Sequence, residues 1–464
     1  MASKLNQGAL LQLIRRLHFY IGLFVGPFIF IAALSGVLYA LTPQLENYLY
    51  RDALIADGHG TMQPLSQQVL AAQHYLGMQV TISSVRPAVT SASTTRVQFV
   101  DKSLGESETR AIFVNPYTLA IQGDYTVYGT SGVLPFRLWI DQLHRNLLLG
   151  DIGRIYSELA ASWMWVAALG GLILWASKKK KSVSSTRKNA FLKSRSLHEL
   201  LGLSLLIGMF FFSATGLTWS KWAGDNVALL RAKMHWQTPS LNTALMASGM
   251  IMTNMHSEHE HHNASETPMF MNPANEVWDL VMLLARNAGI HSTKIEIKPP
   301  KSVSKAWAVS EIDRSWPTQV DGVAIDLSHR RIVDSVHFSD YPLAAKLTRW
   351  GIDFHMGTLF GIVNQLILAV FGIGLCVLIG LVYRIWWLKR PKKAAVQPLE
   401  TMWLSWKACS HIQKVMIVPI ILCLGCAFPV LGASIVCFMM IDIARYALNK
   451  RVDLKTQNFS KPSD

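Results

Sequence analysis

The chain has 464 residues, of which 51% are hydrophobic and 16% charged, and its formal net charge is +15. Several charge-free stretches approach or exceed the roughly 20 residues that a helix needs to cross a bilayer, which indicates an integral membrane protein. Because lipid offers backbone groups no partner, each crossing must be helical. Much of the positive charge lies in two stretches, 177–196 and 384–393, with eight and five basic residues, so it requires no nucleic-acid partner.

The apolar runs divide the chain into alternating membrane and external segments. The first run follows Arg15 and Arg16, but it is too long for a signal peptide and lacks a small-residue cleavage site, which indicates a retained anchor. Lys and Arg accumulate on cytoplasmic loops, so the basic stretches predict a cytoplasmic N-terminus. In chain order we expect transmembrane helix 1 within 1–41, an external domain at 42–155, transmembrane helix 2 at 156–176, a basic cytoplasmic loop at 177–196, transmembrane helix 3 at 197–219, a second external domain at 220–355, transmembrane helix 4 at 356–388, a cytoplasmic segment at 389–414 and a C-terminal membrane segment at 415–441.

Both external segments have the pattern of a small α+β domain. In the first, helical spacing at 64–76 precedes short β-rich runs at 79–87, 94–100 and 110–116. In the second, the same order recurs as a helical pattern at 275–289 and runs at 293–299, 305–312 and 321–327. Neither segment contains a nucleophile elbow, a zincin motif or a phosphate-binding loop, so covalent hydrolysis is not expected.

A duplicated pattern marks the entrances of the first and third transmembrane helices. His18, Gly22 and Gly36 recur as His198, Gly202 and Gly216, with the same spacings of four and eighteen residues. On a regular helix these spacings return to one face, so each triplet is expected to form one stripe about 27 Å long.

A second duplication marks the ends of the external segments. Asn115 precedes His144 by 29 residues, just as Asp326 precedes His355 by 29 residues, and each histidine is followed six residues later by a glycine. The chain is therefore interpreted as a helix, an external domain and a returning helix, performed twice. Sites in such duplicated membrane proteins often lie where the halves meet.

The four histidines of these patterns fall into two pairs by depth. His18 and His198 lie at the cytoplasmic ends of their helices, and His144 and His355 lie near the external ends. Each pair could hold one metal or heme iron, and the glycines would leave room for a flat macrocycle. Bis-histidine heme fits this residue set better than a closed zinc site, which needs more ligands. The alternative is that the histidines only reach toward lipid headgroups and the glycines only pack helices.

Two further features concern metals and thiols. The external stretch 246–271 is rich in methionine and carries four histidines within seven residues, so it is either a flexible loop or a capture site for copper, iron or zinc. Those candidate ligands are His256, His259, His261 and His262. None of the five cysteines lies in an external segment, and the Cys423 and Cys426 pair lacks the strand and helix context of a redox motif. The segment that contains this pair is either one kinked span or a tight hairpin, because it includes Pro419 and Pro429.

These motifs resemble the PepSY-associated transmembrane-helix family, which includes iron-regulated inner-membrane proteins and ferric-siderophore reductases. The resemblance rests on the segments 15–50, 114–118, 141–150, 195–217 and 353–361. It implies a mainly α-helical membrane protein with a duplicated four-helix core, two small PepSY-like α+β periplasmic domains, and one or two extra C-terminal helices.

The same resemblance implies a function. It predicts two b-type hemes with His18, His198, His144 and His355 as ligands, and electron transfer across the bacterial inner membrane to a periplasmic ferric siderophore or other ferric chelate. Because the chain has no nucleotide motif, a quinol or a cytoplasmic reductase would be the donor. The enzyme would thus be a transmembrane ferric reductase in contact with lipid. The alternative is a membrane-anchored PepSY module that binds a peptide or metal, or regulates a partner, without redox activity. A third possibility is a metal transporter. Intramembrane carboxylates would favour transport, and we expect none in the core spans.

Overall fold

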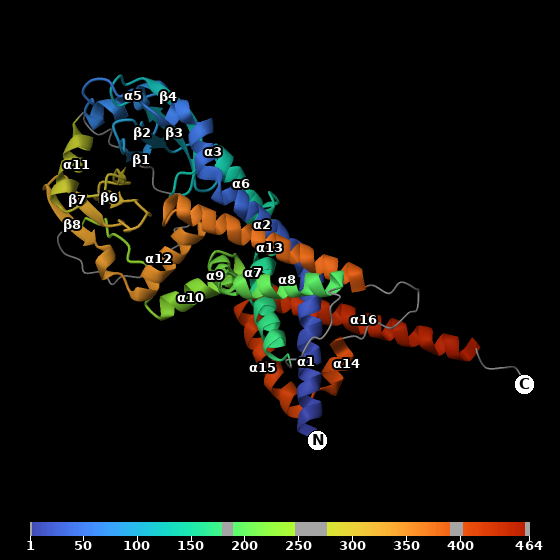
Figure 1. Ribbon diagram of the computed structural model, residues 1–464. Helices are drawn as coiled ribbons and strands as arrows, with labels where there is room; N and C mark the ends of the chain where they lie inside the picture. The colour runs from blue at the N-terminus through green and yellow to red at the C-terminus, as the bar shows by residue number, and fades with distance from the viewer. Residues whose placement is uncertain (1, 179–188, 246–275, 390–401, 460–464) are drawn as a thin grey trace, which may run out of the picture. The chain divides into compact units, whose positions relative to one another are not determined.

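The computed structural model describes residues 2–178, 189–245, 276–389 and 402–459, and Figure 1 shows its elements in chain order. The chain divides into two compact units. The membrane unit comprises residues 1–40, 140–235 and 365–464, and the external unit comprises residues 41–139 and 236–364. The candidate ligands at 256–262 lie outside the described residues.

The membrane unit is helical. Four helical segments of the described chain are long and apolar enough to cross a membrane: Gly8–Ala40, Gly150–Ala176, Gly361–Lys389 and Pro429–Ala447. A fifth crossing is possible if the bent pair Ala190–Ser204 and Leu206–Thr218 acts as one span. The elements of this unit are α1 (Ala2–Tyr20), η1 (Ile21–Val25), α2 (Gly26–Ala40), α6 (Pro135–Asn146, which begins in the external unit), α7 (Gly150–Ala176), α8 (Ala190–Ser204), α9 (Leu206–Thr218), α10 (Trp222–Lys233), α13 (Gly361–Lys389), α14 (Met402–Ala408), α15 (His411–Ala427) and α16 (Pro429–Phe459).

The first span contains a π-helical turn, η1, between α1 and α2. Pro27 follows this turn and lacks the N–H that an α-helix would direct to the carbonyl of Leu23. The hydroxyl of Tyr383, from α13, donates to that carbonyl over 2.7 Å. A polar side chain of a neighbouring helix thus supplies the hydrogen bond that proline removes, as membrane helices with irregular backbone require.

The third span has a different irregularity, a bend of 57° between α8 and α9 at Leu205. The hydroxyl of Ser204 donates to the carbonyl of Leu200 over 3.0 Å, a side-chain bond that often bends helices. Gly208 follows the bend, and an added Cβ there would lie 2.3 Å from the ring of Phe371 in α13. The expectation of one straight stripe through each histidine–glycine triplet is therefore wrong, because a π-turn interrupts one helix and a bend interrupts the other.

The C-terminal segment forms two separate helices that break at Phe428. Near this break, an added Cβ on Gly432 would lie 2.7 Å from the Cα of Gly425, so the two backbones approach closely. Of these two helices, only α16 is long and apolar enough to cross a membrane, in its part Pro429–Ala447, since α15 is shorter. Asp442 of α16 accepts the Trp403 N–H over 2.8 Å and the Tyr20 hydroxyl over 3.3 Å, which links α16 to α14 and α1.

The external unit is built on one antiparallel sheet of eight strands with the order β4-β3-β2-β1-β5-β6-β7-β8. Helices α5 and α11 contribute to one apolar core with the inner strands. The elements of this unit are α3 (Thr42–Leu49), α4 (Arg51–Leu54), α5 (Leu65–Leu76), β1 (Ile82–Arg86), β2 (Thr95–Phe99), β3 (Glu108–Val114), β4 (Ile121–Tyr128), α11 (Val277–Asn287), β5 (Ile295–Lys298), β6 (Trp307–Glu311), β7 (Gly322–Asp326), β8 (Arg331–Val336), η2 (Phe338–Asp340) and α12 (Leu343–His355).

The two halves of this sheet meet at β1 and β5, where Val85 pairs with Ile297. Arg86 and Glu296 form an ion pair of 2.8 Å across the junction. The carboxylate of Asp279, in α11, accepts the N–H groups of Leu65 and Ser66 at the start of α5. The expected two domains therefore share one sheet, because pairing β1 with β5 removes two exposed strand edges.

Candidate functional site

The rings of His18 and His198 lie close together in the membrane unit. Their centroids are 6.3 Å apart and their planes are inclined by 69°. His18 lies two residues before the end of α1, and His198 lies in the middle of α8. The structure therefore brings together the two histidines that the duplicated pattern predicts as one pair.

The ring of His18 contacts α7, a helix that contains neither of the repeated histidine–glycine triplets. Its Nδ1 atom lies 3.0 Å from the carbonyl oxygen of Ala167 in α7. A carbonyl oxygen only accepts, so Nδ1 is the donor and Nε2 carries the free lone pair. An added Cβ on Gly171 would lie 3.2 Å from Cε1 of this ring, and one on Gly170 would lie 3.6 Å from Nδ1. Two adjacent glycines thus allow α7 to approach the ring closely.

The ring of His198 has a different environment. Its Nδ1 atom is buried and has no hydrogen-bond partner among the residues that the structure describes. The carboxylate of the next residue, Glu199, forms ion pairs with Lys178 and Arg195 and does not hydrogen-bond to Nδ1 of His198. A buried imidazole nitrogen without a partner is costly, so this atom marks a place where a further group would be stabilising.

The four predicted glycines do not share one role. Gly36 faces the ring of His144, since an added Cβ there would lie 3.3 Å from Cε1. Gly22 packs against Val382 and Gly202 against Leu378, both in α13, at 3.0 and 4.0 Å from an added Cβ. Gly216 packs against Ala161 in α7, with an added Cβ at 3.2 Å. Three of these four glycines therefore lie against apolar side chains of a neighbouring helix, and Gly36 lies beside a predicted ligand.

His144 lies near the end of α6 and contacts the first span. Its Nδ1 atom is 3.0 Å from the hydroxyl of Ser35, the residue before Gly36. Burial lowers the pKa of His144, although Asp141 one turn earlier acts in the opposite direction. The imidazole is therefore kept neutral at neutral pH, which is the form that binds a metal.

His355 belongs to the external unit and ends α12. Two residues earlier, Asp353 is fully buried, and its Oδ2 atom accepts from Arg349 over 2.8 Å. Burial raises the pKa of Asp353 despite this arginine and Arg314. The carbonyl oxygen of Phe354 accepts from the side chain of Asn364 over 2.9 Å, which ties the end of α12 to the start of α13. The pairing of His355 with His144 stays a prediction.

One carboxylate, Glu158, lies within the expected transmembrane helix 2 at 156–176, although the core spans were expected to contain none. Glu158 is fully buried in α7, because this helix begins at Gly150 rather than where the apolar run begins. Its oxygens accept the backbone N–H groups of Trp222 and Ala223 at the start of α10, at 3.0 to 3.2 Å. The expectation that the core spans hold no carboxylate is therefore wrong, but this one caps a helix and does not line a path.

Sequence reasoning missed Gly170, Gly171 and the carbonyl of Ala167, although the "ALGG" run at 168–171 was a visible signal. Among the described residues, no group of three or more His, Cys, Asp or Glu side chains is placed to hold a metal ion. All five cysteines are free, and Cys423 and Cys426 lie on α15 with exposed side chains.

The comparison with known protein families finds a match over most of the chain. The family model described as the PepSY-associated TM region matches residues 15–389, from the start of the first histidine motif to the end of α13. Helices α14, α15 and α16 lie beyond that match. No curated protein matches the chain. The match covers most of the sequence and confirms the resemblance, so the chain is a multi-pass membrane protein that belongs to the PepSY-associated transmembrane family.

Proposed function

We propose that this protein is a heme-containing electron-transfer protein of the bacterial inner membrane that reduces ferric chelates, including ferric siderophores, on the periplasmic side. The single observation that supports this most is the approach of His18 and His198, whose ring centroids are 6.3 Å apart within the membrane unit. Two imidazoles from different helices are the ligand set of a bis-histidine heme.

The surroundings of the pair fit such a group. Heme-ligating and metal-ligating histidines commonly donate their second ring nitrogen to a backbone carbonyl, as Nδ1 of His18 does to Ala167. No residue that the structure describes forms a hydrogen bond with Nδ1 of His198, so this atom is available to a bound group. Apolar side chains of the first, second and third spans, including Leu17, Val166 and Leu201, pack into the surrounding core. Neutral donors in an apolar setting suit an iron porphyrin better than a free divalent ion.

When bound, heme supplies a one-electron couple that can reduce Fe(III) to Fe(II). The protein residues hold the two imidazoles, set the tautomer of His18 through Ala167, and exclude water with the apolar core. Reduction aids uptake because Fe(II) is softer than Fe(III) and is held less tightly by hard oxygen chelators. One electron from the donor is consumed for each Fe(III) reduced.

We assign the outer level to His144 and His355 in the same proposal. Ser35 contacts the Nδ1 atom of His144, and Gly36 leaves space beside its ring. The donor is a quinol or a cytoplasmic reductase, since the chain has no nucleotide-binding motif. The basic stretches at 177–196 and 384–393 support a cytoplasmic N-terminus, and they thereby support a position of His18 and His198 on the donor side.

The proposal is tested by reconstituting the full chain into liposomes, enclosing a reduced electron donor inside them, and measuring the rate at which an external ferric chelate is reduced. His18→Ala and His198→Ala are each expected to lower the rate at least a hundredfold, because one lost ligand removes the inner heme. His411→Ala is the matched control, since His411 is exposed at the start of α15 in the same unit.

Unchanged rates in both ligand variants would contradict the proposal. A wild-type protein that contains no heme and reduces nothing would favour the binding module without redox activity.

A further inference from the structure

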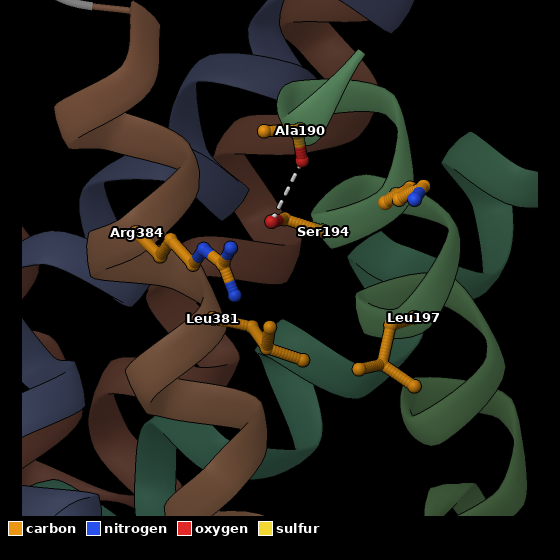
Figure 2. A pocket seen from close by; sticks show the side chains of 6 residues that line it. Ala190, Ser194, Leu197, Leu381 and Arg384 are labelled. Carbon is orange, nitrogen blue, oxygen red and sulfur yellow. Dashed lines mark hydrogen bonds between the residues drawn. The ribbon is translucent and has the colours of Figure 1, made fainter. Parts of the chain in front are cut away.

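A cavity of about 340 Å³ lies between the charged ends of α8 and α13 in the membrane unit. It is lined by Ala190, Lys193, Ser194, Leu197, Leu381 and Arg384. Figure 2 shows Ser194 and Leu197 on one side and Leu381 and Arg384 on the other, with the guanidinium of Arg384 directed across the space. The two helices are far apart in sequence, so the fold creates this site.

The polar part of the cavity is cationic and uncompensated. Lys193 and Arg384 are both exposed, and within the described parts of the chain neither forms an ion pair. The hydroxyl of Ser194 donates to the carbonyl of Ala190 over 2.9 Å, so it does not neutralise either charge. The nearby carboxylate of Glu199 is paired with Lys178 and Arg195. Two cations without an ion-pair partner or a lining carboxylate fit an anion. They do not fit a quinol, because the oxidation of a quinol requires a proton acceptor.

The apolar part of the cavity continues along both helices. On α8, Leu197 and Leu200 follow Lys193 at helical spacing, and they are 44% and 62% exposed. On α13, Leu381 and Val377 precede Arg384 at the same kind of spacing. Each helix thus presents a cation at its end and aliphatic side chains one and two turns deeper in its span. An inorganic anion would use only the cationic layer, whereas a phospholipid would use both.

Two exposed tryptophans near Arg384 indicate how deep the cations of the cavity lie in the membrane. Trp386 and Trp387 lie two and three residues after Arg384 and are 41% and 56% exposed. Exposed tryptophans in membrane proteins concentrate at the level of the lipid headgroups. The cations of the cavity therefore lie where a lipid phosphate lies, and the aliphatic side chains lie where acyl chains begin.

We propose that this cavity binds an anionic phospholipid, with its phosphate between Lys193 and Arg384 and its acyl chains along the aliphatic faces of α8 and α13. Leu197 directly precedes His198, and Leu378, one turn from Leu381, packs against Gly202. A lipid in this site joins α8, which carries His198, to α13. Membrane composition then influences how firmly His198 is positioned.

The experiment is a thermal unfolding series on the delipidated, detergent-purified full chain with phosphatidylglycerol, phosphatidylcholine or inorganic phosphate added. Native mass spectrometry counts the lipids retained. Phosphatidylglycerol is expected to raise the midpoint and to remain bound, whereas the other two probes have little effect. Lys193→Gln and Arg384→Gln should each weaken phosphatidylglycerol binding roughly fivefold, and the double variant roughly 25-fold.

Lys389→Gln is the matched control, because Lys389 is an exposed cation at the end of α13 outside the cavity. Circular dichroism verifies that each variant is folded. Equal weakening by Lys389→Gln would show general attraction to anionic lipid and overturn the site. An equal shift with inorganic phosphate would assign the cavity to a free anion and overturn the lipid assignment. Neither result depends on heme, so the proposal fails or stands separately from ferric reduction.

Discussion

The two halves of the chain carry the same sequence pattern. Their equivalent segments have similar structures in the external unit but different structures in the membrane unit. In the external sheet, Asn115 and Asp326 follow or end equivalent strands, and each side chain accepts the backbone N–H groups two and three residues later. The strand order is symmetric about the β1–β5 junction. A shared spacing of 29 residues before His144 and His355 therefore reflects a shared turn.

In the membrane helices the equivalent segments diverge. After His18 the first span passes through a π-turn, whereas after His198 the third span bends by 57°. The Nδ1 atom of His18 donates to Ala167, whereas Nδ1 of His198 has no partner within the described structure. Hydrogen-bonded turns depend on local residues, so a repeated residue pattern forms the same turn twice. Helix paths depend on neighbours such as Tyr383 and Phe371, which differ between the halves.

The junction of the two sheet halves should show the largest stability effect. Arg86→Met leaves the buried carboxylate of Glu296 with an ion pair to Lys298 at 3.0 Å and a hydrogen bond from the Ser84 hydroxyl at 3.3 Å. We expect a loss of about 3 kcal/mol in the free energy of unfolding of the external unit, which is the low end for breaking a buried ion pair. Chemical denaturation followed by tryptophan fluorescence measures this loss, because Trp278 and Trp307 pack together in the same core.

Arg110→Met is the control for that experiment. Arg110 pairs with Asp124 over 2.6 Å, but its side chain is 41% exposed. An exposed pair contributes less than about 1 kcal/mol. If both variants lose the same free energy, the two sheet halves are not joined by the Arg86–Glu296 pair.

The equivalent glycines Gly22 and Gly202 should respond differently to alanine. The added methyl group of Gly22→Ala would lie 3.0 Å from Val382, so we expect a loss of about 1–3 kcal/mol from overpacking. In Gly202→Ala the methyl group would lie 4.0 Å from Leu378, which is ordinary contact, and the higher helix propensity of alanine offsets any cost. Thermal unfolding in detergent compares the two variants, and equal destabilisation would mean that the helices are equivalent after all.

The smallest effect concerns pH and the two equivalent turns. Burial alone would raise the pKa of Asp326, but hydrogen bonds from His329 and Arg331 outweigh it and lower the pKa. A carboxyl group with a lowered folded-state pKa stabilises the fold above its unfolded value, near 3.9, and loses this contribution as the pH falls through the folded value. Asp326→Asn places at this turn the residue type that Asn115 provides in the first half. Because asparagine does not titrate, the melting temperature of this variant should fall less between pH 6 and pH 3 than that of the wild type.

Much of the external sheet was predictable from the sequence. The inner strands and the helices α5 and α11 coincide with the expected runs, except that β3 begins two residues before its run, because their apolar residues are dense and regular. The outer strands β4 and β8 were not predicted as strands. Their side chains are mostly half-buried or exposed, so their hydrophobic pattern is weak.

The histidine site was predictable only in part. The repeat predicted that His18 and His198 form a pair, and their rings lie near each other. It could not predict the contact of His18 with α7, because Ala167, Gly170 and Gly171 belong to neither copy of the pattern. Nor could it predict the π-turn, since the hydrogen bond that supports it comes from Tyr383, 360 positions away.

The most direct test of the central claim is a heme count on the detergent-purified chain. The reduced-minus-oxidised visible spectrum, calibrated by pyridine hemochrome, should give two b-type hemes in the wild type and one in either His18→Ala or His198→Ala. Absence of heme from wild-type protein expressed with adequate heme supply would contradict the account. Loss of both hemes, or of neither, in the two variants would contradict the assignment of His18 and His198 as one ligand pair.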